Sequence, residues 1–397
     1  MSIVNKYNYI FIIFVFIASI ILFFTANTLD ISYDESLIYF NNSSILNILT
    51  NISTYIFGKS NIALRLPFVL SYIISSVLFY KISKIYIKKN RDQLISVLIF
   101  ISLPGLISSA LLVNISILVI LFTLLYIYLY NKTNKHSYFL LVLFLILDNS
   151  FAILFISLFF YSLRQKDNYL LVVSLALFGI SMQVYGFDTG GKPKGFFIDT
   201  IAIYMSIFSP LIFFYFVYSL YKSALNDSLD LLWYIATTTL VFSLLLSFRQ
   251  NINIEEFAPF VVIAIPIMVK IFLNSYRVRL PQFRNKHKLW LNITIIVLLI
   301  NSIVLIYNKP LYLYFEYPSK HFAYKYHFTS LIASKLHNLN ISHINIIDKQ
   351  LASKLKFYGI YDGSDYTLVK EKPKNIYKII NIDYLDKEIS KFYIIKN

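Results

Sequence analysis

Eleven apolar stretches with very few charges follow one another through the first three quarters of this 397-residue chain. About 20 such residues in a helix cross the ~30 Å hydrocarbon core of a bilayer. A water-soluble core of this size does not need the 58% of residues that are hydrophobic here. The pattern predicts an all-α polytopic membrane protein with about 11 transmembrane helices, at 8–28, 66–83, 94–112, 115–130, 138–148, 151–163, 169–186, 200–221, 230–248, 258–275 and 289–307.

Two of these stretches, 138–148 and 151–163, are short for a membrane span. Basic residues flank the pair on both sides, and a single span would place those flanks on opposite faces of the membrane. We therefore interpret the pair as a helical hairpin that turns at Asp148. The first stretch lacks a small-residue cleavage site, so we interpret it as a retained anchor.

Lysine and arginine are distributed unevenly between the loops. If the N-terminus is cytoplasmic, the cytoplasmic loops hold sixteen of them and the short external loops hold five. This bias predicts that the N-terminus lies inside and, after eleven spans, that the C-terminus lies outside. The net charge of +16 is then mainly a consequence of topology, and it does not imply nucleic acid as a partner.

The last part of the chain, residues 310–397, has a different pattern. Short alternating runs such as Ile344–Asp348 are separated by segments with helical spacing and by turn residues. We expect a small α/β domain on the outer face, following a membrane domain at 1–309. The sequence contains no cysteine, which excludes disulfides. It also contains no phosphate-binding P-loop, which argues against an ATP-driven transporter encoded by this chain alone.

A compact acidic cluster lies directly after the first apolar stretch. The sequence L-D-I-S-Y-D-E-S places Asp30, Asp34 and Glu35 at the start of an external loop, residues 29–65. The middle of this loop is amphipathic and could lie along the membrane surface. The loop ends in A-L-R-L-P, which includes Arg65 and leads into the second span.

This arrangement resembles the GT-C glycosyltransferases that use polyprenyl-phosphate sugars, in the branch of protein O-mannosyltransferases and lipid A aminoarabinose transferases. The stretch L-S-F-R-Q-N-I-N-I-E-E-F, which includes Arg249, is similar to a late external loop of that branch. The resemblance implies a multi-pass glycosyltransferase of the bacterial inner membrane. It would move a sugar from a polyprenyl-phosphate donor to a lipid A, surface-glycan or protein acceptor, with inversion, at the outer face among membrane lipids.

The resemblance also implies roles for particular residues. Asp34 would be the general base for the acceptor hydroxyl, with Glu35 or Asp30 positioning the acceptor or adjusting Asp34. External cations would stabilise the leaving phosphate, and arginine suits bidentate phosphate contacts better than lysine. The candidates are Arg65, Arg249, Lys59, Lys192 and Lys194.

Two positions depart from the family pattern. Asn114 stands where many relatives carry a second acid, which disfavours a divalent metal cofactor because hard cations prefer several anionic oxygens. Asp148 stands where a cation is common. Both residues are possible polar site residues, but the interpretation as a turn or helix-cap residue is favoured for Asn114 and slightly favoured for Asp148. The histidine spacing matches no zinc site.

Other functions stay open at this level. A transporter or flippase of a lipid-linked saccharide would carry charges deep within its spans, whereas these spans are nearly free of charge. A glycan polymerase would need its large loop late in the chain. A non-catalytic scaffold is compatible with the departures at Asn114 and Asp148, and in it the acids Asp34 and Glu35 would be interfacial charges or a helix N-terminal pair.

Overall fold

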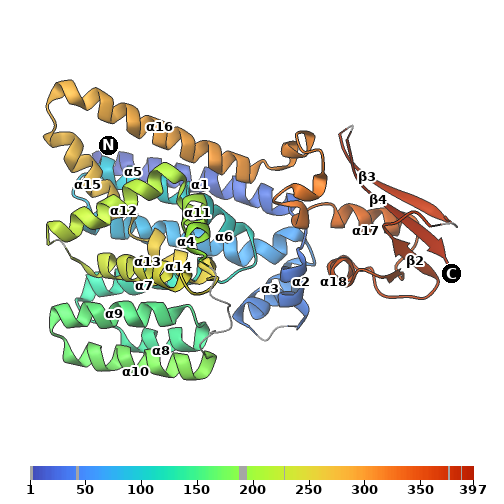
Figure 1. The fold of residues 1–397 in the computed structure, drawn as a ribbon, viewed down its shortest axis with the longest axis horizontal. Coiled ribbons are helices and arrows are strands. Elements are labelled where there is room, and N and C mark those ends of the chain that lie inside the picture. The colour runs from blue at the N-terminus through green and yellow to red at the C-terminus, as the bar shows by residue number, and fades with distance from the viewer. Residues whose placement is uncertain (1–2, 42–43, 187–194, 228, 374–375, 386) are drawn as a thin grey trace. The chain divides into compact units, whose positions relative to one another are not determined.

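The computed structural model describes residues 3–41, 44–186, 195–227, 229–373, 376–385 and 387–397. The described chain is mostly helical and ends in a small sheet (Figure 1), which confirms the predicted fold class. Its membrane-type helices are α1 (Ile3–Thr28), α4 (Asn61–Tyr86), α5 (Asn90–Ile101), α6 (Pro104–Leu111), α7 (Ser116–Thr133), α8 (Tyr138–Leu147), α9 (Phe151–Gln165), α10 (Asn168–Tyr185), α11 (Phe197–Phe208), α12 (Pro210–Leu225), α13 (Leu231–Ser247), α14 (Ile254–Val262), α15 (Ile265–Val278) and α16 (Pro281–Ile306).

The number of spans differs from the expected eleven. Within the described residues, five helices are long and apolar enough to cross a membrane, and up to eight spans result if each bent helix pair is one span. The three bent pairs are α5 with α6, α11 with α12, and α14 with α15. The remaining expected spans are α8, α9 and α13, with 10, 15 and 17 residues, which are short for a hydrocarbon core that takes about 20.

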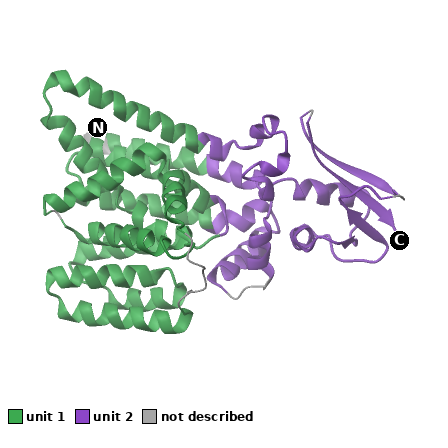
Figure 2. Cartoon of the chain, viewed as in Figure 1, with its two compact units in different colours: residues 1–20, 68–110, 114–302 green, residues 21–67, 111–113, 303–397 purple. Residues whose placement is uncertain are grey.

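The chain divides into two compact units (Figure 2). Unit 1 comprises residues 1–20, 68–110 and 114–302, and unit 2 comprises 21–67, 111–113 and 303–397. The division cuts through α1 and α4 and places the first loop with the C-terminal residues. It therefore runs differently from a boundary at 309/310.

Unit 1 is a helical bundle with an apolar interior. Helices α8, α9 and α10 lie side by side, and α9 also packs against α13 (Figure 1). Aromatic rings fill much of the interior, as in the stacked pair Phe79 and Phe100, whose centroids are 3.9 Å apart. Small hydroxyl side chains are also buried, and one of them, Ser76, bonds to a carbonyl of its own helix. Such small residues allow close approach of membrane helices.

Unit 2 contains the first-loop helices and a four-stranded mixed sheet. The first loop folds as α2 (Tyr33–Asn41) and α3 (Ile45–Phe57). The sheet order is β1-β2-β4-β3, with β1 parallel to β2 and the other neighbours antiparallel. The remaining elements are η1 (Lys309–Leu313), η2 (Pro318–Lys320), η3 (Tyr324–Tyr326), α17 (Thr329–Asn338), β1 (Asn345–Ile346), α18 (Lys349–Phe357), β2 (Tyr366–Val369), β3 (Lys378–Tyr384) and β4 (Lys387–Lys396).

Sequence alternation explains the sheet. In β3, Ile380 and Ile382 point into the core, whereas their neighbours Ile379 and Asn381 are exposed. These isoleucines pack with the apolar faces of α17 and α18, including Leu336. The sheet and its two helices thus form the small C-terminal α/β domain that the sequence predicts.

Candidate functional site

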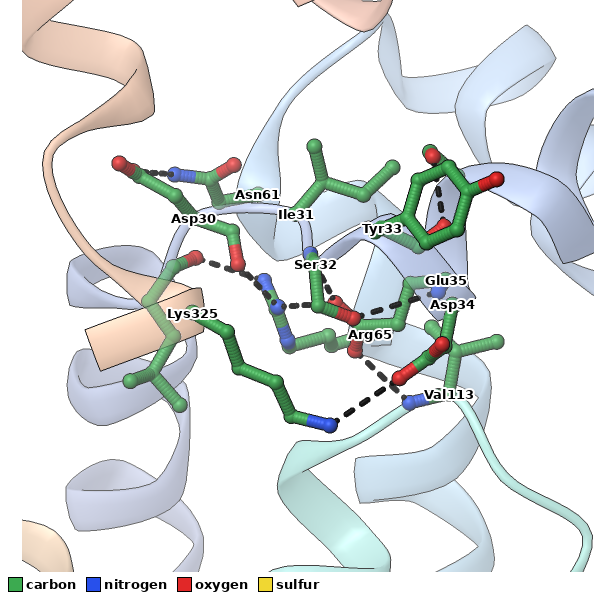
Figure 3. Close-up of polar contacts among 12 residues, drawn as sticks. Asp30, Ile31, Ser32, Tyr33, Asp34, Glu35, Asn61, Arg65, Val113 and Lys325 are labelled. Carbon is green, nitrogen blue, oxygen red and sulfur yellow. Dashed lines mark hydrogen bonds and ion pairs between the residues drawn. The ribbon is translucent and has the colours of Figure 1, made fainter. Parts of the chain in front are cut away.

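The acidic cluster lies at the N-terminus of α2, where a reciprocal pair of hydrogen bonds starts the helix (Figure 3). The backbone N–H of Ser32 donates to Glu35 Oε2 at 2.8 Å, and the backbone N–H of Glu35 donates to Ser32 Oγ at 3.2 Å. This is a capping box, in which a serine and a glutamate three residues later satisfy two helix N–H groups. The S-x-x-E spacing was visible in the sequence and would have predicted this structural role for Glu35.

Glu35 is also the partner of a fully buried arginine. Arg65 has 0% of its side chain exposed and Glu35 has 3%, and Arg65 Nη2 lies 3.0 Å from Glu35 Oε2. The same guanidinium donates to the carbonyls of Leu29 and Asp30, at 2.7 and 2.9 Å. The other oxygen of Glu35 accepts from the backbone N–H of Val113 at 3.0 Å. In this structure Arg65 therefore fixes the first loop and presents no surface to a phosphate.

Asp30 bonds to the C-terminal part of the same unit. Its Oδ2 accepts from the backbone N–H of Ser330 at 2.9 Å, in the first turn of α17. The residue before α17, Phe328, provides no side-chain cap, so Asp30 supplies the negative charge that a helix N-terminus favours. The backbone N–H of Asp30 donates to the carbonyl of Tyr326 at 2.7 Å. The side chain of Asp30 is 3% exposed.

Asp34 differs from the other two acids because its carboxylate faces solvent. Its side chain is 69% exposed, and it forms an ion pair with Lys325, which is 55% exposed, at 3.0 Å (Figure 3). Burial lowers the pKa of Lys325, but the charges and hydrogen bonds of Tyr326 and Asp34 outweigh this effect and raise the pKa above its ordinary value. Lys325 is therefore a cation beside Asp34 at neutral pH.

Further polar side chains of unit 2 contact both ends of the first loop, near Asp30 and Asn61. The Tyr358 hydroxyl donates to Asn61 at 2.7 Å and accepts from the backbone N–H of Ile31 at 3.1 Å. Burial lowers the pKa of Lys309 and of Lys354, and in both cases the charge of Asp30 opposes the shift. These contacts hold the first loop against the C-terminal segment.

Lys59, the remaining predicted cation of unit 2, is exposed in the turn between α3 and α4. It takes part in none of the ion pairs found among the described residues.

Helix α3 has an unusual distribution of side chains. Its hydroxyl-bearing residues are buried: Ser53 bonds to the carbonyl of Ala63, and Thr54 bonds to the Tyr39 hydroxyl at 3.0 Å. Its apolar face is exposed, with Ile52 at 53% and Tyr55 at 92%. An exposed apolar face of this kind suits the interface region of a bilayer.

The other predicted site residues lie in unit 1 or outside the described residues. Asn114 Oδ1 accepts from the backbone N–H of Ser116 at 2.8 Å, at the start of α7. Asp148 Oδ1 accepts from the backbone N–H of Ser150 at 2.9 Å, in the turn between α8 and α9. Arg249 is exposed just after α13. Lys192 and Lys194 lie outside the described residues.

The acids of the first loop do not fit a metal site, because N–H donors occupy the oxygens of Asp30 and Glu35. Within the described part of the chain, no group of three or more His, Asp or Glu side chains is placed to hold a metal ion. Sequence reasoning missed Ser32, Lys325 and Tyr358. Only Ser32 carried a local sequence pattern, since the other two meet the loop through contacts about 300 residues apart in sequence.

Comparison with known proteins agrees with the resemblance drawn from the sequence. Residues 44–178 match the profile of the dolichyl-phosphate-mannose-protein mannosyltransferase family. The fold is similar to the crystal structure of ArnT from Cupriavidus metallidurans in the apo state, with a TM-score of 0.57 and 9% sequence identity. That match covers 99% of this chain and 98% of ArnT. No curated protein sequence matches the chain.

The chain therefore has an ArnT-like multi-span membrane fold, and residues 44–178 are similar to the mannosyltransferase family. Both similarities agree with the resemblance to GT-C glycosyltransferases that was drawn from the first loop. The matched range begins after Glu35, so the roles of the three acids depend on the structure of unit 2.

Proposed function

We propose that this protein transfers a sugar from a polyprenyl-phosphate donor to a lipid, glycan or protein acceptor at the outer face of the bacterial inner membrane, with Asp34 as general base. The observation that carries this proposal is the contrast among the three acids. Asp30 and Glu35 are buried and bonded, whereas Asp34 is exposed on the first turn of a capped helix.

In the proposed step, the acceptor oxygen attacks the anomeric carbon of the donor sugar. The bond from that carbon to the phosphate oxygen breaks, and its electron pair leaves with the polyprenyl phosphate. The acceptor proton passes to the Asp34 carboxylate. A single displacement of this kind inverts the anomeric carbon.

The capping box and Arg65 would act as positioning groups in this reaction. They fix the backbone on both sides of Asp34, and catalysis requires a base held within hydrogen-bond reach of the acceptor. Lys325 would orient the Asp34 carboxylate through their ion pair until the acceptor replaces it. Exposed Lys59 and Arg249, together with Lys192 and Lys194, remain the proposed cations for the donor phosphate.

The test is mass spectrometry of surface glycolipids and glycoproteins from a strain that lacks the gene, complemented with wild type or Asp34→Asn. Wild type should restore a species heavier by the mass of one sugar residue. With Asp34→Asn, the rate at which this species forms should be lower by at least about 100-fold, the usual contribution of a general base. Asp383→Asn, at an exposed carboxylate in β3, is the matched control.

Equal membrane abundance of all variants is required in this comparison. If Asp34→Asn restores the mass as well as wild type does, Asp34 is not the base. If wild type restores no sugar mass but removes a one-sided accumulation of lipid-linked saccharide seen in the deletion strain, the protein is a flippase and not the transferase.

A further inference from the structure

A polar hollow lies in unit 1, and none of the residues that the proposed reaction uses lines it. Its lining residues come from the ends of α4 and α7, from the starts of α5 and α13, and from the second half of α15. Its volume is about 710 Å³. We call it the basic hollow; its lining residues are Ile85, Tyr86, Ile87, Lys88, Lys89, Asp92, Asn131, Asp230, Lys270, Asn274 and Arg277.

The charge of the basic hollow is positive. Four cationic and two acidic side chains line it, and buried Asp92 pairs with Arg277. Lys88, Lys89 and Lys270 take part in none of the ion pairs among the described residues. The N-terminus of α5 also opens here, and a helix N-terminus adds positive potential.

Helix α15 provides a polar stripe to this hollow. Lys270, Asn274 and Arg277 are four and three residues apart, so they share one face of the helix. Lys270 belongs to an apolar segment, where a charge is costly and usually functional. A long lysine side chain can reach from such a position to the membrane interface.

We propose that the basic hollow binds a phosphate-bearing anion, and that this anion is the headgroup of an anionic phospholipid. The ammonium groups would contact the phosphate, and the amides of Asn131 and Asn274 would contact its ester or glycerol oxygens. Basic pockets between membrane helices recognise headgroups in this way. Helix α4 begins at Asn61, next to the first loop that we expect outside, and the hollow lies at its other end, at Tyr86. The bound lipid would therefore belong to the cytoplasmic leaflet.

The experiment measures lipid binding to the full-length protein in detergent by native mass spectrometry, with phosphatidylglycerol as probe and phosphatidylcholine as comparison. Near a surface each lysine contributes about fivefold in affinity for an anionic lipid. Lys270→Met should weaken phosphatidylglycerol binding by about fivefold, and the double variant Lys88→Met/Lys89→Met by about 25-fold. Because Lys88 and Lys89 are exposed, the double variant also serves if Lys270→Met does not fold.

Lys286→Met is the matched control, because it removes the same charge from an exposed position of α16 outside the hollow. If it weakens binding as much as Lys270→Met, the attraction is general and the site is refuted. Inorganic pyrophosphate separates the two sources of phosphate. Displacement of phosphatidylglycerol by pyrophosphate in wild type supports the headgroup site. Lysine-dependent binding of pyrophosphate without any preference for phosphatidylglycerol would instead identify a soluble anion and refute the lipid.

Discussion

The three acids of the first loop occupy very different surroundings although they lie within six residues. Asp30 caps α17, and Glu35 closes the capping box and pairs with Arg65. Both carboxylates therefore have fixed donors, and only Asp34 can exchange its partner Lys325 for a substrate. Asp30 and Glu35 therefore stabilise the structure, whereas Asp34 is the acid that can contact a substrate.

The buried pair of Arg65 and Glu35 should be essential for the stability of unit 2. Arg65→Met leaves a buried carboxylate unpaired and frees two backbone carbonyls, so we expect a loss of about 3–5 kcal/mol. Calorimetry of the purified protein measures this loss. Removing both partners together, in Arg65→Met/Glu35→Met, should cost less than the sum of the single changes. Strict additivity would show that the two side chains do not interact.

His327 should make stability depend on pH. It is buried, its Nδ1 lies 3.0 Å from the Tyr312 hydroxyl, and burial together with the charges of Lys309 and His321 lowers its pKa to about 3. The ordinary value is about 6.5, so between these pH values the unfolded chain binds a proton that the folded chain does not. The contribution of neutral His327 to the free energy of unfolding is therefore complete above pH 6.5, and it is lost progressively as the pH falls toward 3.

The measurement is the melting temperature by calorimetry between pH 7 and pH 4. The decline should be shallower for His327→Gln than for wild type, by a few degrees over this range. His337→Gln, at an exposed histidine of α17, should keep the slope of the wild type. Equal slopes in wild type and His327→Gln would contradict this explanation.

At the scale of elements, α3 combines a polar buried face with an apolar exposed face. Its hydroxyls bond to α2 and α4, so the helix is fixed to the first loop by its polar side. The apolar side must then meet lipid or another protein. An amphipathic helix that lies in the membrane interface meets this requirement.

Single-cysteine labelling can test the position of α3, because the chain has no cysteine of its own. A fluorophore at Ile52→Cys or Tyr55→Cys should be quenched several-fold more by a nitroxide on lipid acyl chains than one at Lys59→Cys. The reason is that Ile52 and Tyr55 lie on the exposed apolar face, whereas Lys59 lies in the turn that follows it. Stronger quenching at Lys59 would place the apolar face against protein or water.

The sequence predicted those features that depend on local pattern. Hydropathy predicted the helices and alternation predicted β3 and β4, because each of these elements buries its own apolar face. Bends such as the 104° angle between α11 and α12 were not predicted, since helix packing decides whether one apolar run is one helix or two. At the site, Ser32 and Glu35 were readable from their spacing, whereas Lys325 meets Asp34 only through the tertiary fold.

For the whole molecule, the membrane topology is restricted by which segments of the chain make up unit 2. Residues 21–67 and 303–397 form one compact unit, so the first loop and the C-terminal domain must share one face of the membrane. The distribution of basic residues between the loops predicts which face this is, and by the positive-inside tendency we expect unit 2 to lie outside. The shared face follows from the compactness of unit 2, and the orientation follows from the basic residues of the loops. One experiment can test both inferences.

That experiment labels single cysteines on intact cells with a maleimide that does not cross the inner membrane. Lys59→Cys and Asp362→Cys, both exposed in unit 2, should react with similar rates before lysis. Lys135→Cys, in the exposed loop between α7 and α8, should react at least about tenfold more after lysis, because basic loops are retained inside. Opposite accessibility of positions 59 and 362 would refute the shared face of unit 2. Labelling of 135 alone in intact cells would keep the shared face and reverse the orientation, and the acceptor of the transferred sugar would then be cytoplasmic.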